Sequence, residues 1–252
     1  QAGVSYKLNN MISVAGGVRY VMVSNHYEGT VSNVKLITQE GTMPVPEASL
    51  ELDADQTGNG ITPIISVFIE PVEALDLSLR YEMKTDLELE NKSEKDPLGM
   101  YPEDINPNAD LPALLALGGS YQLTPKARIE ASFNYFFAED VDWDGAEEYL
   151  ENEYEGGLAV EYSLSDALCA SAGYLYSTTS ATKDYQSDLS YGLDSHTIGL
   201  GVRYKVNENL KLDAGVLNTF YSEMEVPTNS VFGVPLPMTV NRTYQKTTMD
   251  FS

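Results

Sequence analysis

Apolar and polar residues alternate with a period of two over long stretches of the chain. Between residues 75 and 84 the odd positions are apolar or aromatic and the even positions are polar or charged, and residues 128–135 show the same order. Successive side chains of a β-strand point to opposite faces, so each stretch presents one apolar and one polar face. On an α-helix the same residues would spread around the whole circumference. The pattern therefore predicts β-strands whose two faces differ in chemistry.

The alternating stretches belong to a repeat. In five segments an aromatic residue precedes a short turn and an alternating strand follows it: 6–20, 68–81, 121–135, 162–176 and 204–221. Between them lie longer, polar and acidic segments, at about 24–47, 91–110, 140–154, 178–194 and 225–240. This order predicts a sheet with short turns at one end and long loops at the other, which is typical of transmembrane β-barrels.

Eleven strands are expected, at 2–8, 11–23, 48–70, 75–90, 111–123, 127–138, 155–164, 168–178, 194–205, 210–224 and 240–252. Tyr6 precedes a short turn by a few residues, Tyr20 follows it by about ten, and parity places both on the apolar face. About ten tilted residues cross the apolar thickness of a bilayer, so such pairs predict two aromatic belts. The fold class is therefore an all-β, antiparallel transmembrane β-barrel, with residues 1–252 as one barrel domain. A soluble β-sandwich is the alternative, although its strands usually have only about five or six residues.

Composition narrows the function. The chain has 15 Lys+Arg against 38 Asp+Glu, a formal net charge of −23. A phosphate backbone would be repelled, so nucleic acid is not expected as a partner. No apolar run reaches the roughly 20 residues that a transmembrane helix needs. Nucleophile, phosphate-binding and Cys/His metal motifs are missing, so an enzyme is not expected.

Several phrases resemble the FadL/TodX-type outer-membrane transporters of long-chain fatty acids and hydrocarbons. They are GVSYKLNNMISVAGGVRYVMVSNHYEG, DLPALLALGGSYQLTPKARIEASFNYFF and SHTIGLGVRYKVNENLKLDAGV. The resemblance implies a barrel of fourteen strands with an N-terminal plug, in the bacterial outer membrane. The eleven strands would be the last eleven, so the chain is expected to be a fragment without the plug, the first strands and the end of the last strand. A monomer is favoured, with outer-membrane lipid around it.

The resemblance also implies candidate ligand residues. Segments 24–47 and 91–110 match the two loops that form an apolar capture groove in that family. Their apolar residues are Val34, Leu36, Ile37 and Met43 in the first loop, and Leu98, Met100, Tyr101 and Ile105 in the second. The alternative is that these side chains only pack the loop on itself. Strand parity adds Arg19 and Arg80 as partners for a ligand carboxylate; alternatively, they pair with inward acids such as Glu82.

The segment 140–151, DVDWDGAEEYLE, matches the spacing of a calcium loop through Asp140, Asp142, Asp144 and Glu151. Calcium is thus the one cofactor candidate, and a solvated acidic loop is the alternative. The function expected overall is passive transport of fatty acids or other small hydrophobic molecules through a lumen. An adhesin or structural barrel with acidic, calcium-binding loops is the second hypothesis.

Overall fold

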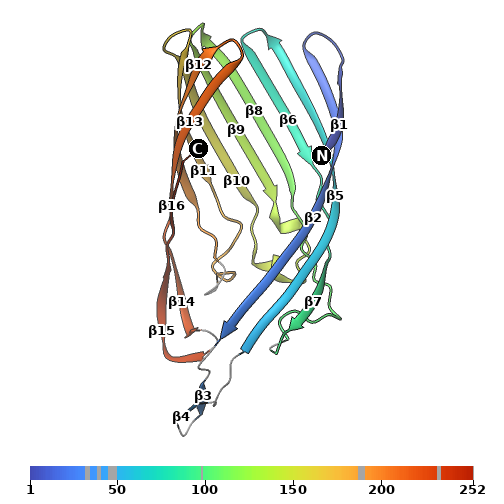
Figure 1. Cartoon of the computed structure of the whole chain (residues 1–252), viewed down its shortest axis with the longest axis vertical. Coiled ribbons are helices and arrows are strands. Elements are labelled where there is room, and N and C mark those ends of the chain that lie inside the picture. Colours follow the sequence, from blue (N-terminus) through green and yellow to red (C-terminus); the bar gives the residue numbers. More distant parts are fainter. Residues whose placement is uncertain are drawn as a thin grey trace.

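The computed structural model describes residues 1–31, 35–38, 41–44, 50–97, 99–186, 191–231 and 234–251. It contains one large antiparallel sheet with the strand order β1-β2-β5-β6-β8-β9-β10-β11-β12-β13-β16. These strands are β1 Ala2–Lys7, β2 Ile12–Val31, β5 Leu50–Val72, β6 Leu75–Glu82, β8 Ala113–Thr124, β9 Ala127–Phe137, β10 Glu153–Ser163, β11 Leu168–Ser177, β12 Ser195–Asn207, β13 Leu210–Tyr221 and β16 Thr247–Phe251. The sheet curls into the wall of a barrel (Figure 1).

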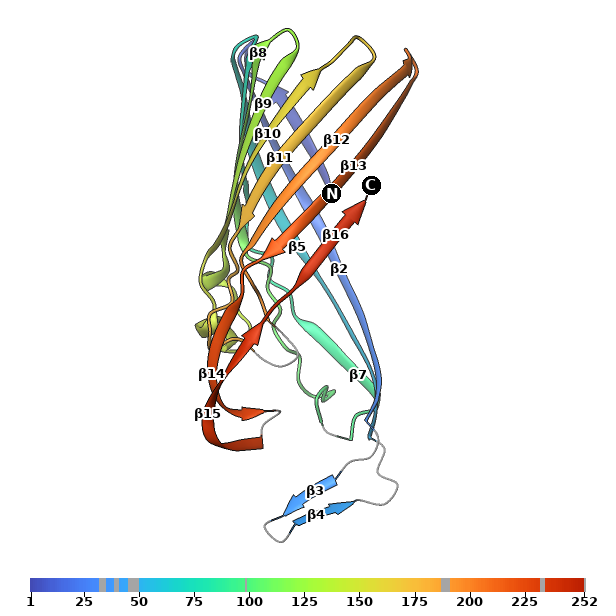
Figure 2. The same ribbon diagram turned by 90° about the vertical axis from the view of Figure 1, so that its left-hand side faces the viewer.

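Neighbours in the sheet follow the order of the chain, so almost every connection is a hairpin. The short turns gather at the top of Figure 1 and the long connections at the bottom, as the repeat predicts. Within the described residues β1 pairs only with β2 and β16 only with β13, so these strands are the two edges of the curled sheet (Figure 2). The all-β, antiparallel barrel fold is confirmed, and the eleven expected strands correspond to the eleven of the main path.

Four expected boundaries were wrong, all at the long-loop end. β2 continues to Val31 and pairs with β5 through the register Val31↔Leu50, so the strand predicted at 11–23 is longer. The strand predicted at 75–90 ends at Glu82, and a separate strand, β7 Leu89–Lys95, pairs with β5. The segment expected as a loop at 225–240 is a hairpin of β14 Met224–Val231 and β15 Val234–Tyr244, and the last predicted strand is split between β15 and β16. Backbone hydrogen bonds extend these ladders beyond the apolar pattern, because pairing needs no apolar side chains.

The buried side chains lie mainly under the long loops, where connections from several hairpins meet. This small core contains Leu87, Leu89, Ala113, Ala138, Val141, Leu150, Ala181 and Leu193. Two single-turn 3-10 helices, η1 Ala138–Asp140 and η2 Ala146–Tyr149, close the connection from β9 to β10. A short hairpin of β3 Lys35–Thr38 and β4 Gly41–Pro44 extends farthest from the barrel wall. Among the described residues, no helix is long and apolar enough to cross a membrane.

Candidate functional site: a cavity inside the barrel wall

The outer face of the sheet is apolar and exposed. It carries aliphatic side chains from every region of the wall, among them Val4, Val18, Ile61, Ile65, Leu79, Leu117, Leu158, Val160, Ile198 and Leu200. A soluble monomer rarely exposes a continuous apolar surface of this extent. The predicted sandwich alternative would bury this face against a second sheet; within the described part of the chain, no such layer exists.

Tyrosines border the apolar face at both ends. Near the short turns these are Tyr6, Tyr121, Tyr162 and Tyr204; near the long loops they are Tyr20, Tyr81, Tyr135, Tyr154 and Tyr174. Tyr154 and Tyr162 of β10 are eight residues apart, or about 26 Å along a strand. If the strand is tilted by about 40° from the barrel axis, this length corresponds to about 20 Å along the axis, close to the height of about 25 Å of the apolar band in outer-membrane barrels. The arrangement is that of two interfacial belts.

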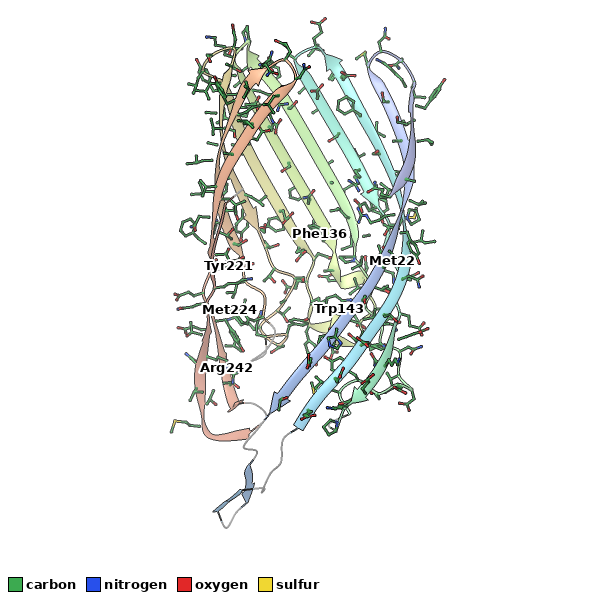
Figure 3. All side chains as sticks on the ribbon, viewed as in Figure 1. Met22, Phe136, Trp143, Tyr221, Met224 and Arg242 are labelled. Atoms are coloured by element: carbon green, nitrogen blue, oxygen red, sulfur yellow. The ribbon has the colours of Figure 1, made fainter. Side chains whose placement is uncertain are left out.

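The outer face becomes polar beyond the second belt. Along β2 the outward positions change from Tyr20 and Met22 to Ser24, His26 and Glu28. Figure 3 labels Met22, the last apolar residue before this change. His26 Nδ1 lies 2.9 Å from Asp55 Oδ1 in the next strand, where both side chains are exposed. The extended β2–β5 hairpin therefore leaves the apolar band and continues into a water-accessible region.

The inner face, which carries Ser78, Arg80 and Glu82 on β6, is lined in its middle by small residues. A cavity of about 560 Å³ lies against it, lined by residues from β5 round to β13. Its inward lining includes Phe68, Asp76, Ser78, Gly118, Ser120, Glu130, Ser132, Gly157, Ala159, Gly173, Leu175, Thr197, Gly199 and Leu217. Most of these residues are glycine, alanine, serine or threonine. The space exists because the wall carries little side-chain volume at this level.

Serine and glycine face each other across neighbouring strands of this wall. A Cβ atom added to Gly118 would lie 2.6 Å from Ser78 Oγ, and one added to Gly157 would lie 2.6 Å from Ser132 Oγ. Outward-facing Gly156, by contrast, has no atom of the described residues within 4 Å of an added Cβ. Each serine hydroxyl thus lies over a glycine, which keeps the wall flat on the side of the cavity.

Charged residues of the inner face pair with each other along the wall. The carboxylate of Glu82, whose side chain is 5% exposed, forms ion pairs with the guanidinium groups of both Arg19, at 2.6 Å, and Arg80. Two guanidinium groups share one carboxylate, and the buried Nε of Arg80 has no hydrogen-bond partner among the residues that the structure describes. The alternative weighed from the sequence, pairing with an inward acid, is therefore what the structure shows for both arginines. Binding of a ligand carboxylate by Arg19 and Arg80 stays a prediction.

A second set of ion pairs lies nearer the short turns. Arg128 contacts Glu130 at 2.6 Å and Glu161 at 3.9 Å, and Arg203 contacts Asp213 at 2.6 Å. These side chains are between about a third and two thirds exposed, so each pair contributes little stability by itself. Their effect is to place fixed charges of both signs along the inner wall.

The candidate ligand residues of the second loop lie partly together. Tyr101 stacks on Tyr27 of β2, with ring centroids 4.8 Å apart, and burial raises the pKa of its phenol. Asp96 accepts hydrogen bonds from the backbone amides of Met100, at 2.9 Å, and Tyr101, at 2.6 Å. The side chains of Met100 and Ile105 are 56% and 55% exposed. The loop is therefore folded on itself and still presents apolar side chains to solvent.

The first-loop candidates can be placed only in part. Leu36 and Ile37 lie in β3 and Met43 in β4, with Leu36 opposite Met43 in the register of this hairpin. Val34 and Leu98 lie outside the described residues. The capture groove expected between the two loops stays a prediction.

Carboxylates of the acidic loop have hydrogen-bond partners within the protein. Among the described residues, no three carboxylates, histidines or cysteines are placed to hold one metal ion. Asp144 accepts hydrogen bonds from the backbone amide and the side-chain amide of Asn108, at 2.9 and 3.0 Å. Asp142 accepts from the amide of Asp144 at 3.1 Å, and the amide of Glu151 donates to the carbonyl oxygen of Ser180 at 2.7 Å. Calcium binding through Asp140, Asp142, Asp144 and Glu151 stays a prediction.

Asp110 is the residue of this region that the sequence did not single out. Its side chain accepts hydrogen bonds from the amides of Leu87 and Asp142, at 3.0 and 3.1 Å, and from Lys84 Nζ at 2.5 Å. Its carbonyl oxygen accepts the indole N–H of Trp143 at 2.9 Å. Burial opposes ionisation of Asp110, but Lys84 and the two amides outweigh it and hold its pKa below the ordinary value. Asp110 thereby connects two long loops at the mouth of the barrel, where Figure 3 labels Trp143.

Comparison with known proteins supports the fold. A family model described as "Putative MetA-pathway of phenol degradation" matches residues 109–225, just under half of the chain. No protein with a curated function matches. Among solved structures, a Pseudomonas aeruginosa FadL homologue aligns with a TM-score of 0.63 at 15% identity, covering 90% of this chain and 60% of that chain.

Two further structures give the same picture. The Ralstonia pickettii toluene transporter TbuX aligns with a TM-score of 0.56 at 14% identity, covering 88% of this chain and 61% of that one. The monoaromatic hydrocarbon channel CymD aligns with a TM-score of 0.55 at 11% identity, covering 87% and 67%. The chain thus spans about 60% of the first of these structures, and it has the fold of FadL/TodX-type barrels, as the sequence resemblance predicted.

Proposed function

We propose that this chain is part of a channel of the bacterial outer membrane that passes small hydrophobic molecules by passive diffusion. The observation that carries the proposal is the contrast between the two faces of one sheet. The outer face is a tyrosine-bordered apolar band, and the inner face is lined by serine, glycine and alanine around a cavity of about 560 Å³. Ligand pockets for small molecules have volumes of about 300–1,000 Å³.

The similar solved structures support the same function, since their names describe a toluene transporter and a monoaromatic hydrocarbon channel. A transport protein, not an enzyme, is therefore proposed. Fatty acids and aromatic hydrocarbons are both ligand candidates at this level. The exposed apolar side chains of Met100 and Ile105 would take part in capture at the long-loop end, together with the other apolar loop residues predicted from the sequence.

Narrowing the cavity tests the proposal. In Gly157→Phe the new ring enters the space beside Ser132 and Leu175. Because the ring fills volume that the ligand would occupy, the affinity for a hydrophobic ligand is expected to fall by about tenfold or more. The measurement is equilibrium dialysis of radiolabelled toluene against the protein, expressed from its complete open reading frame and reconstituted in lipid nanodiscs.

Gly156→Phe is the matched control. Gly156 is the adjacent residue of β10, but it faces outward, and no atom in the described part of the chain lies within 4 Å of an added Cβ. The ring would point into lipid, and toluene binding should stay within about twofold of the wild type. If the two variants bind toluene equally well, the cavity is not the ligand path and the channel proposal fails.

A further inference from the structure

We propose that Asp76 and Glu130 exclude carboxylates from the cavity, so that its ligands are uncharged hydrophobic molecules and not ionised fatty acids. This inference rests on the proposed channel function and names the ligand class within it. It starts from the charge of the cavity wall. Of the described residues that line the cavity, only Asp76 and Glu130 carry charge, and both are acids.

The two carboxylates lie in one row of the inner wall. Asp76 of β6 is opposite Ser120 of β8, and Ser120 is opposite Glu130 of β9. The Ser120 hydroxyl donates to Asp76 Oδ2 at 3.1 Å, which holds this carboxylate against the wall. Three neighbouring strands thus place two anionic groups beside the same space.

These charges are only partly neutralised. Asp76 makes no ion pair among the residues that the structure describes. Glu130 forms an ion pair with Arg128 at 2.6 Å, but the same guanidinium group also pairs with Glu161 at 3.9 Å. One cation therefore serves two acids, and Arg128 does not itself line the cavity. Within the described part of the chain, Asp76 has no counter-charge. A carboxylate entering this space would lose hydration and gain a repulsive neighbour, whereas an uncharged ring loses little hydration and meets no repulsion.

The arginines of the inner wall do not offset this effect in the cavity. Arg80 is two residues nearer the long loops than Ser78, and together with Arg19 it pairs with Glu82. A carboxylate held at these two arginines would remain outside the space between Asp76 and Glu130. Competition with a ligand bound in the cavity therefore separates the two locations.

The experiment is competition against radiolabelled toluene in nanodiscs at neutral pH, with the protein expressed from its complete open reading frame. Ethylbenzene, which is uncharged, is expected to displace toluene from the wild type, and benzoate is expected to displace it at least about tenfold less well. In the double variant Asp76→Asn with Glu130→Gln, benzoate should compete about tenfold better than in the wild type, because two like charges beside the ligand carboxylate are removed. Ethylbenzene should be unaffected.

A control variant isolates the position of the charge. Glu94→Gln removes an exposed charge on β7, away from the cavity. It should discriminate against benzoate as the wild type does. The inference is overturned if benzoate and ethylbenzene compete equally in the wild type, or if the double variant leaves the discrimination unchanged. Absence of saturable toluene binding in the wild type would instead count against the channel proposal itself.

Discussion

Asp110 and Trp143 show how single residues organise the mouth of the barrel. Asp110 is 3% exposed, yet it is ionised at neutral pH because Lys84 and two backbone amides surround it. The indole of Trp143, the only tryptophan in the sequence, donates to the backbone of the same residue. Hydrogen bonds to this one buried aspartate therefore help to attach the acidic loop to the neighbouring long loop, together with those from Asn108 to Asp144.

Replacing this aspartate should loosen both loops. In Asp110→Asn, Lys84 loses its closest counter-charge and the amides of Leu87 and Asp142 lose a charged acceptor. The expected cost is about 1–3 kcal/mol of local stability, or about ten- to a hundredfold faster amide exchange in the peptides around Leu87 and Asp142. Hydrogen–deuterium exchange measures it, with the exposed Asp104→Asn as control. Unchanged exchange at these amides would show that Asp110 does not hold the loops.

Acid should have the same effect on the unaltered protein. The pKa of Asp110 is lower in the folded state than in an unfolded chain, so its contribution is complete above the unfolded value of about 4. It is lost as the pH falls through the lower, folded value. The emission of Trp143 should therefore change only below about pH 4, and in Asp110→Asn this transition should be missing.

At the scale of the strand, the two faces should respond in opposite ways to the same charge. Leu158 of β10 faces outward and is 54% exposed, whereas its neighbour Ala159 faces the cavity opposite Glu130. An arginine at the lipid-facing position near the middle of the band costs about 2–4 kcal/mol. An arginine at position 159 would instead lie opposite the carboxylate of Glu130.

We therefore expect Leu158→Arg to reduce the folding free energy in lipid vesicles by about 2–4 kcal/mol and Ala159→Arg to change it by less than about 1 kcal/mol. The measurement is reversible denaturant titration followed by the gel mobility of the folded barrel. The reverse ranking would mean that the sheet faces lipid with its polar side.

For the whole molecule, the position of the apolar band predicts which parts contact lipid. Trp143 lies among the long loops, beyond the belt of Tyr20, Tyr81 and Tyr135. Its emission, taken as the difference between the wild type and Trp143→Phe, should be quenched by acrylamide in the water. Lipids brominated along their acyl chains should leave it unchanged, because contact quenching needs proximity to the bilayer core. Quenching by the brominated lipids would place the loop end inside the membrane.

Alternation along residues 75–84 and 128–135 was sufficient to predict the strands, their two faces and the hairpin order. The reason is that strand geometry is local: side chains alternate by covalent structure, and a short turn joins neighbours. The paired tyrosines likewise indicated two belts without any coordinates. Because the apolar pattern marks only the band in contact with lipid, it missed the extension of β2 to Val31, the separate strand β7 and the β14–β15 hairpin.

Contacts between distant strands were decided by the tertiary structure alone. Parity placed Arg19 and Arg80 on the inner face, but only the fold showed that both reach the same Glu82, because strand tilt and register determine which inward residues meet. The spacing of Asp140, Asp142, Asp144 and Glu151 fits a calcium loop, but only the fold shows that Asp144 accepts hydrogen bonds from Asn108, in another loop, and Asp142 from the amide of Asp144. Asp110 had no sequence signal at all, because its role arises from three segments that approach one another only in space. The sequence thus determined the wall of the barrel, and the folding of its loops and the curvature of its sheet determined the mouth and the cavity.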